Sequence, residues 1–209
     1  MTEPMIDWLN AQQQNMLYLL ADLVNIDSNS FDKVGVDKVA DRLQAFFDNH
    51  GIPHETIPLK DHGDALRAVV SGGDGNRPIL LCGHRDTVFA AGEVKKRPFS
   101  TRDGKAFGPG VADMKPGLVI NSFILAAFHK FGGHPNPLIG LFTGDEEIGS
   151  PSSKNIIIAE AEKARLAFNS EPSRPSGNIV TGRKGGIFCH CAITGVAAHS
   201  GGFFTEGRS

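Results

Sequence analysis

The sequence is poor in the features that mark secreted, membrane-spanning and nucleic-acid-binding proteins. Its 209 residues include only three cysteines, an odd number without the spacing of a disulfide framework, which favours a reducing compartment. No stretch approaches the roughly 20 consecutive apolar residues of a membrane span. The net charge of −2 gives no support for a nucleic-acid or membrane-surface partner. Met1–Asn10 lacks the basic start and apolar stretch of a secretion signal, so we expect a soluble, cytoplasmic protein.

Apolar runs alternate with amphipathic segments along most of the chain. The apolar share of 40% is sufficient for a core, and the 25 glycines and 12 prolines indicate many turns. The alternation predicts an α/β sheet with helices on its faces. We predict helices over Ile6–Val24, Asp32–Phe47, Lys115–Phe131 and Ser152–Ala164 and an irregular loop over Glu93–Arg102. We predict strands over His54–Pro58, Ala65–Ser71, Pro78–Cys82, Leu138–Phe142, Arg165–Phe168, Asn178–Thr181 and Ile187–Thr194.

Three consecutive acidic residues follow one of these predicted strands. The strand Leu138–Phe142 is followed by Thr-Gly and then by Asp145, Glu146 and Glu147. Like charges repel, and ionised carboxylates are costly to bury without a counter-charge, so such a cluster at a strand end favours a bound cation. A solvated acidic turn is the alternative.

A histidine and an aspartate follow another predicted strand, in the sequence Gly-His-Arg-Asp-Thr. Residues two apart in an extended segment share a face, so His84 and Asp86 are expected to point the same way. A carboxylate beside an imidazole is the usual arrangement that fixes the tautomer of a metal-binding histidine. A purely structural hydrogen-bonded pair is the alternative.

Two further acidic residues lie at element ends. Asp113 stands in a Gly-Pro-Gly turn just before a predicted helix, where it could equally be the helix N-cap, and Glu171 follows the strand Arg165–Phe168. In open α/β sheets, functional groups gather beyond the carboxyl ends of the strands. One histidine with several carboxylates is a suitable ligand set for zinc or a similar divalent ion.

Four motifs in this order, GHRDTV, GPGVADMKPG, TGDEEIGS and NSEPS, closely resemble the dinuclear-zinc family of aminoacylases and carboxypeptidases. The resemblance extends from about Trp8 to the end of the sequence. It implies a central mixed sheet flanked by helices, followed by the start of a smaller α+β dimerisation domain. The expected division is a catalytic domain over 1–184 and the beginning of the dimerisation domain over 185–209.

The resemblance also implies the metal ligands. His84 would bind one zinc ion, with Asp86 behind it as the orienting carboxylate. Asp113 would bridge both ions. Glu171 would be a further ligand of the first ion, and Glu147 would bind the second. The family's peptide bond directly after the bridging aspartate is typically cis. Two Zn²⁺ ions are thus expected in a complete site, and Co²⁺ or Mn²⁺ could substitute.

The implied reaction is hydrolysis of the amide bond of an N-acyl amino acid or peptide. Glu146 would be the general base that takes a proton from the metal-activated water and passes it to the leaving amine. His199, in GVAAHSGG, would reach a partner subunit's site in a homodimer and stabilise the oxyanion. Cys189 and Cys191 share one face of a predicted strand, and we interpret them as small surface residues rather than as a metal pair.

The sequence departs from the family in one respect. The family's second zinc ion takes a further histidine from a later segment of a much longer chain, and no such segment is present. We therefore expect this chain to be a truncated form, inactive alone. The competing hypothesis is a remnant that binds metal or a partner subunit without turnover.

Overall fold

The computed structural model describes residues 2–73, 75–173, 176–178, 184–185, 189–192 and 194–208. The chain divides into two compact units, residues 1–172 and residues 173–209. The domain boundary expected from the sequence, between 184 and 185, stays a prediction.

The first unit is built on a five-stranded mixed sheet with the strand order β1-β2-β6-β3-β7. Strands β6, β3 and β7 run parallel, whereas β1, β2 and β6 pair antiparallel. The strands are β1 (His54–Ile57), β2 (Ala65–Val70), β3 (Ile79–His84), β6 (Leu138–Thr143) and β7 (Leu166–Asn169). The predicted central mixed sheet is therefore confirmed, and all five strands overlap the ranges predicted for them.

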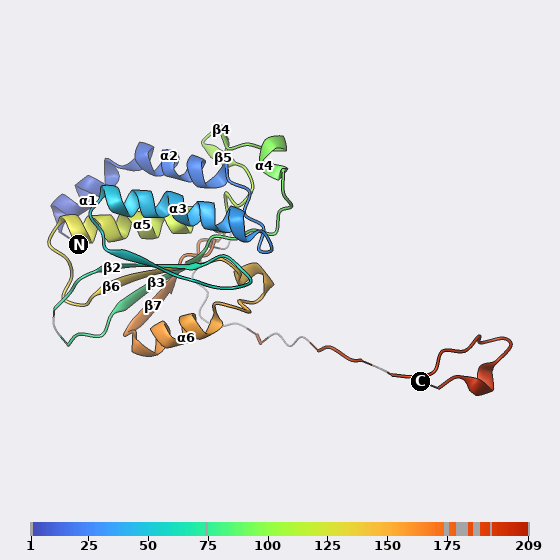
Figure 1. The fold of residues 1–209 in the computed structure, drawn as a ribbon. Helices are drawn as coiled ribbons and strands as arrows, with labels where there is room; N and C mark the ends of the chain where they lie inside the picture. The colour runs from blue at the N-terminus through green and yellow to red at the C-terminus, as the bar shows by residue number, and fades with distance from the viewer. Residues whose placement is uncertain are drawn as a thin grey trace. The chain divides into compact units, whose positions relative to one another are not determined.

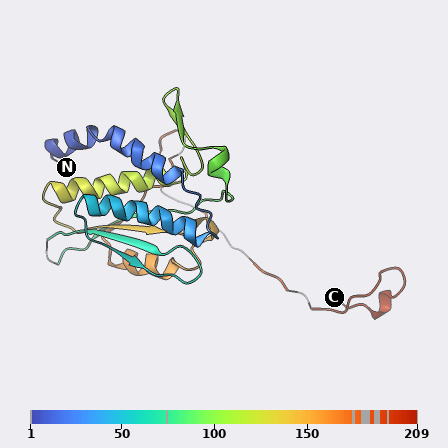
Figure 2. The same cartoon turned by 45° about the horizontal axis from the view of Figure 1, so that its top comes forward.

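Helices cover both faces of this sheet, and Figures 1 and 2 show α6 on the face opposite to the other long helices. Because both faces are covered, every residue of β6 is buried, which explains its uninterrupted apolar run. No helix among the described residues is long and apolar enough to cross a bilayer. These other helices are α1 (Glu3–Asn10), α2 (Gln13–Val24), α3 (Lys33–Asn49) and α5 (Lys115–Lys130), and α6 spans Lys154–Lys163.

The single helix predicted over Ile6–Val24 is wrong, because the structure divides it into α1 and α2. The Gln12 amide donates to the carbonyl of Leu9, three residues back, at 3.0 Å, so the helix tightens and changes direction there. The change allows Trp8 of α1 to pack against Phe123 and Phe131, each with a ring-centroid distance of 6.3 Å. Tertiary packing on α5 therefore overrides the continuous periodicity.

The irregular loop predicted over Glu93–Arg102 is also wrong. It contains a short helix, α4 (Glu93–Lys96), and the first strand of a hairpin, β4 (Ser100–Arg102) with β5 (Lys105–Phe107). The Asp27 carboxylate, far away in sequence, accepts hydrogen bonds from the Gly92 and Val94 amides and so fixes the start of α4. The hairpin turns at Asp103-Gly104, both with positive φ, a dipeptide typical of tight hairpins.

The described part of the second unit is small. Val196 and Arg208 form an antiparallel bridge that encloses a 3-10 helix, η2 (Phe204–Glu206). Of the strands predicted over Asn178–Thr181 and Ile187–Thr194, the described residues 178, 189–192 and 194 are not in strands, and the other residues lie outside the described part of the chain.

Strand β7 is an edge of the described sheet and carries exposed apolar side chains. Leu166 and Phe168 are 52% and 55% exposed, and Phe168 lines an apolar cavity of about 790 Å³ between the sheet and the helices α1, α2 and α5. Exposed apolar edge strands are sites of association. We therefore expect the chain to self-associate through β7. The double substitution Leu166→Lys and Phe168→Lys should convert it to monomer in sedimentation velocity.

A control is the pair Phe31→Lys and Val34→Lys, which removes two even more exposed apolar side chains, just before α3 and in its first turn. If the control pair reduces association as much as the β7 pair does, general surface apolarity rather than the sheet edge is responsible.

Candidate metal centre

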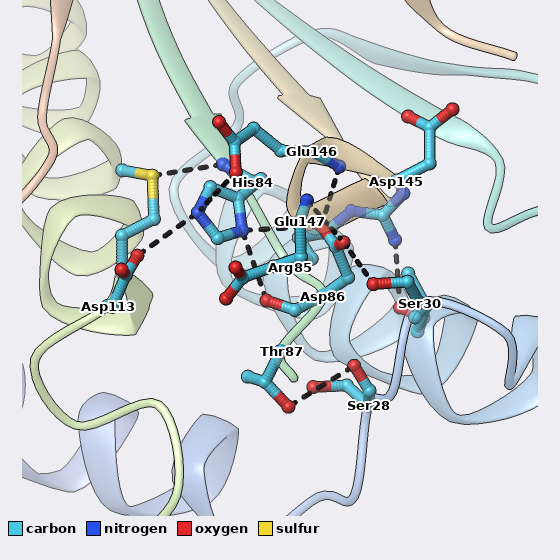
Figure 3. Close-up of polar contacts among 12 residues, drawn as sticks. Ser28, Ser30, His84, Arg85, Asp86, Thr87, Asp113, Asp145, Glu146 and Glu147 are labelled. Atoms are coloured by element: carbon cyan, nitrogen blue, oxygen red, sulfur yellow. Dashed lines mark hydrogen bonds and ion pairs between the residues drawn. The ribbon is translucent and has the colours of Figure 1, made fainter. Parts of the chain in front are cut away.

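His84 is the last residue of β3, and its imidazole is buried with one nitrogen facing Asp86 (Figure 3). Nδ1 of His84 lies 3.0 Å from the backbone oxygen of Asp86 and 3.3 Å from its Oδ1. Both neighbours are acceptors, so Nδ1 carries the proton and donates. Nε2 is therefore the nitrogen that a metal ion would bind, in place of its proton. The sequence argument that these two side chains point the same way is confirmed.

The other ring nitrogen of His84, Nε2, faces three carboxylates from three other segments. Its Nε2 lies 3.2 Å from Asp113 Oδ1, 3.4 Å from Glu171 Oε1 and 3.6 Å from Glu146 Oε2. Two ligand sets share this histidine, and within each set the ligand atoms lie within 4.8 Å of one another. The sets are His84 with Glu146 and Glu171, and His84 with Asp113 and Glu147.

These sets differ in two respects from the ligands that the family resemblance implies. The resemblance leaves Glu146 off the metal, but the structure places Glu146 with His84 and Glu171 at ligand spacing. It also places His84 in both sets rather than in one. The individual roles of these residues stay predictions.

Only two of the three consecutive acids reach the centre. Strand β6 ends at Thr143, and Glu146 and Glu147 open the 3-10 helix η1 (Glu146–Ile148). Asp145 is fully buried and turned away (Figure 3), where its carboxylate accepts hydrogen bonds from the Ser152 and Ser153 amides at 2.7 and 3.1 Å. Asp145 therefore fixes the chain between η1 and α6. Only Glu146 and Glu147 are available to bind a cation.

Asp113 reaches the centre from the loop before α5. The N-cap position of α5 is held by Met114, which excludes the alternative in which Asp113 caps that helix. The Asp113–Met114 peptide bond is cis, as the resemblance implies. Lys115 follows with its ammonium buried, donating to the backbone oxygens of Leu23 and Ile26 at 2.8 and 2.9 Å. Burial lowers the pKa of Lys115 to about 7, and these contacts tie the loop to the end of α2.

Glu171 is positioned by close packing of the chain after β7 against α5. A Cβ atom at Gly117 of α5 would lie 2.2 Å from the backbone oxygen of Ser170, so only glycine allows this approach. The Ser170 hydroxyl donates to Asn121 Oδ1 at 2.7 Å, and Asn121 in turn donates to the Cys82 backbone oxygen on β3. These contacts hold Glu171 next to His84.

The electrostatics of the centre favour a divalent cation. Burial and the neighbouring carboxylates raise the pKa values of Asp113, Glu146 and Glu147. Burial lowers the pKa of His84, but hydrogen bonds with Asp86 and Glu171 outweigh it and raise that pKa to about 11. One imidazolium cannot neutralise so many acids. An imidazole nitrogen and several carboxylate oxygens are ligands that zinc and similar ions accept, so the residues fit a metal.

Sequence reasoning missed the supporting residues, among them Arg85. Its guanidinium is fully buried and donates to the backbone oxygens of Val36 and Asp64, which lie on α3 and in the loop before β2. Burial lowers the pKa of Arg85 to about 10. The alternation that pairs His84 with Asp86 also places Arg85 on the opposite side of the segment, so this residue could have been found. Ser30, Lys115 and Asn121 gave no such signal.

The remaining predicted site residue is His199, in the second unit. Its Nδ1 accepts a hydrogen bond from the Gly201 amide at 3.2 Å, and its backbone oxygen accepts from Gly202 and Phe203. Its contact with a substrate stays a prediction. Cys189 and Cys191 are both exposed and free.

Known proteins are similar to this chain in both sequence and fold. It is 32% identical over 195 residues to carboxypeptidase G2 of Pseudomonas sp. (strain RS-16), covering 91% of this chain and 46% of the relative. It is 26% identical over 201 residues to acetylornithine deacetylase of Edwardsiella ictaluri (strain 93-146), covering 92% and 51%. The chain thus spans about half the length of these curated relatives.

Solved structures agree at the level of the fold. Human carnosine dipeptidase 1 superposes with a TM-score of 0.69 at 15% identity, over 81% of this chain and 41% of that protein. The M20 family metallo-carboxypeptidase Sso-CP2 from Sulfolobus solfataricus gives 0.65 at 20% identity, over 78% and 38%. Residues 80–199, which contain every residue of the centre, match the sequence profile described as peptidase family M20/M25/M40. The chain therefore belongs to peptidase family M20/M25/M40.

Proposed function

We propose that this chain is the catalytic part of a zinc-dependent hydrolase that cleaves the amide bond of an N-acyl amino acid or small peptide. The observation that carries the proposal is the convergence of carboxylates from three segments on Nε2 of His84. Membership of a peptidase family and similarity to a carboxypeptidase and a deacetylase support the same chemistry.

The residues of the centre have distinct tasks in this proposal. His84, Asp113, Glu147 and Glu171 would hold the metal, which when bound supplies a cation that acidifies water and polarises the scissile carbonyl. Asp86 holds the imidazole with Nε2 directed at the metal position. Glu146 accepts the proton of the attacking water and delivers it to the leaving amine. Burial raises the pKa of Glu146, which brings that carboxyl nearer to the range of an effective base and acid at neutral pH.

Further parts of the proposal concern the whole protein. A catalytic domain over 1–184 would be followed by a dimerisation domain beginning at 185–209, in a cytoplasmic homodimer. His199 of one subunit would stabilise the oxyanion in the other. Co²⁺ or Mn²⁺ could replace Zn²⁺, because a nitrogen and oxygen ligand set accepts all three ions.

The number of bound ions follows from the sharing of His84. Its Nε2 can bind one ion only, and each set without it retains two carboxylates. We therefore expect metal analysis of the 209-residue chain, dialysed against zinc, to give nearer one ion than two. Two tightly held ions would mean that a further residue, with His199 the first to test, completes the second set.

The activity itself is tested on two chains. The 209-residue chain and a chain extended to the length of its relatives are incubated with zinc and a panel of N-acyl amino acids and dipeptides. We expect amino-acid release from the extended chain only, with loss on addition of a chelator. Zinc-dependent release by the 209-residue chain would show that its site is complete. Zinc binding without release by either chain would support the remnant hypothesis instead.

A further inference from the structure

The Asp86 carboxylate is the meeting point of three elements of the centre. It is fully buried, and four polar groups surround it. Oδ2 accepts from the Ser30 hydroxyl at 2.7 Å and from the Glu147 amide at 3.1 Å. Oδ1 accepts from the Glu146 amide at 3.2 Å and faces His84 Nδ1 at 3.3 Å. One carboxylate thus positions the histidine and the backbone of both neighbouring glutamates.

Among these partners, Ser30 alone comes from outside the proposed metal ligands and base. It lies in the loop between α2 and α3, is 2% exposed, and forms the shortest of the four contacts (Figure 3). The loop is held independently of that contact, since the Ser28 backbone oxygen accepts from the Thr87 amide at 2.8 Å and Asn29 bridges to Thr87. Ser30 is therefore a fixed donor at the edge of the helical layer.

The geometry requires such a donor. Rotation of an aspartate carboxylate about its terminal torsion is only weakly restricted, so hydrogen bonds must set its plane. Asp86 has to orient the amides of Glu146 and Glu147 and the ring of His84. These groups therefore cannot also fix the orientation of the Asp86 carboxylate. The Ser30 hydroxyl can, because its loop is anchored to Thr87.

We propose that Ser30 is a positioning residue of the metal centre. It acts through Asp86 to hold His84 and the start of η1 in the positions that metal binding requires. This inference rests on the proposed metal site. Loss of the hydroxyl leaves the ligands in place but allows the Asp86 carboxylate to rotate, so both ligand sets loosen together.

The test compares two buried serines of the same loop. Ser28 is 1% exposed, and its hydroxyl has no hydrogen-bond partner among the described residues, so Ser28→Ala is a matched control for Ser30→Ala. Zinc affinity is measured by competition with a chromophoric chelator, and the visible spectrum of the Co²⁺-loaded chain reports ligand geometry. Thermal unfolding of the metal-free chain separates a loss of folding from a loss of metal affinity.

We expect Ser30→Ala to weaken zinc binding about tenfold, the lower end of the effect of removing a group behind a metal ligand. The Co²⁺ bands should shift, Ser28→Ala should leave both measurements unchanged, and Ser30→Thr, which keeps the hydroxyl, should restore them. Ser30→Cys, which keeps the volume but donates weakly, replaces the alanine variant if that variant does not fold.

Two results would overturn the inference, and they can be told apart. Unchanged zinc affinity and an unchanged Co²⁺ spectrum in Ser30→Ala would leave the metal site intact and show that Ser30 does not position it. Absence of zinc binding by the unsubstituted chain would contradict the proposed metal site itself, and the inference with it.

Discussion

Glu146→Gln should abolish amide hydrolysis in the extended chain and leave its zinc content unchanged. The substitution keeps the size of the side chain and the backbone amide that donates to Asp86, so the start of η1 stays in place. What is lost is the ability to take up a proton, and a positioned general acid–base group is worth about 10²–10⁴-fold in rate. The measurement is the rate of amino-acid release together with metal analysis of the same sample.

Glu147→Gln is the matched comparison, since it is the same change one residue along. Its carboxylate belongs to the set with His84 and Asp113, so zinc content should fall along with activity. The structure gives this pair of variants particular value, because it also places Glu146 at ligand spacing from Glu171. Loss of zinc from Glu146→Gln with retention by Glu147→Gln would mean that the two tasks are exchanged.

His84→Ala should remove metal binding altogether, because this histidine belongs to both ligand sets. Removal of a group behind a ligand already costs about 10–100-fold in affinity, and loss of the ligand itself should exceed the upper end of that range. By contrast, Glu171→Ala and Glu147→Ala each affect one set and should leave measurable affinity. Zinc titration of the three variants gives the comparison.

His62→Ala is the control for a general effect of histidine removal. His62 is half-buried, hydrogen-bonds to the Ser152 hydroxyl at 2.7 Å and belongs to neither ligand set. His84→Gln, with circular dichroism of the metal-free chains, distinguishes loss of a ligand from loss of the fold at this buried position. Zinc bound by His84→Ala as tightly as by the unsubstituted chain would show that the metal lies elsewhere.

The sequence by itself determined the sheet and which segments meet at its edge. Strands such as β3 and β6 are continuous apolar runs because they are buried on both faces, and this pattern needs no knowledge of neighbours. The position of His84 two residues before Asp86 fixed their common direction by backbone geometry alone. Placement of the acidic residues directly after strands likewise predicted that they would gather at one edge of the sheet.

Only the tertiary structure decided what each polar residue at that edge does. Asp145 and Glu146 are adjacent acids in the same motif, but the first is buried against Ser152 and Ser153 and the second faces His84. The break between α1 and α2 also depends on a distant element, because Trp8 packs on α5. Local patterns contain no information about such long-range partners.

The same reason explains why Ser30 was missed. In the sequence it is one small polar residue in a polar break, identical in type to Ser28 two positions earlier. In the fold, the Ser30 hydroxyl donates to a carboxylate 56 residues away, whereas the Ser28 hydroxyl has no partner among the described residues. Direction and distance in three dimensions separate the two serines, and these are set by the packing of α2 and α3 on the sheet.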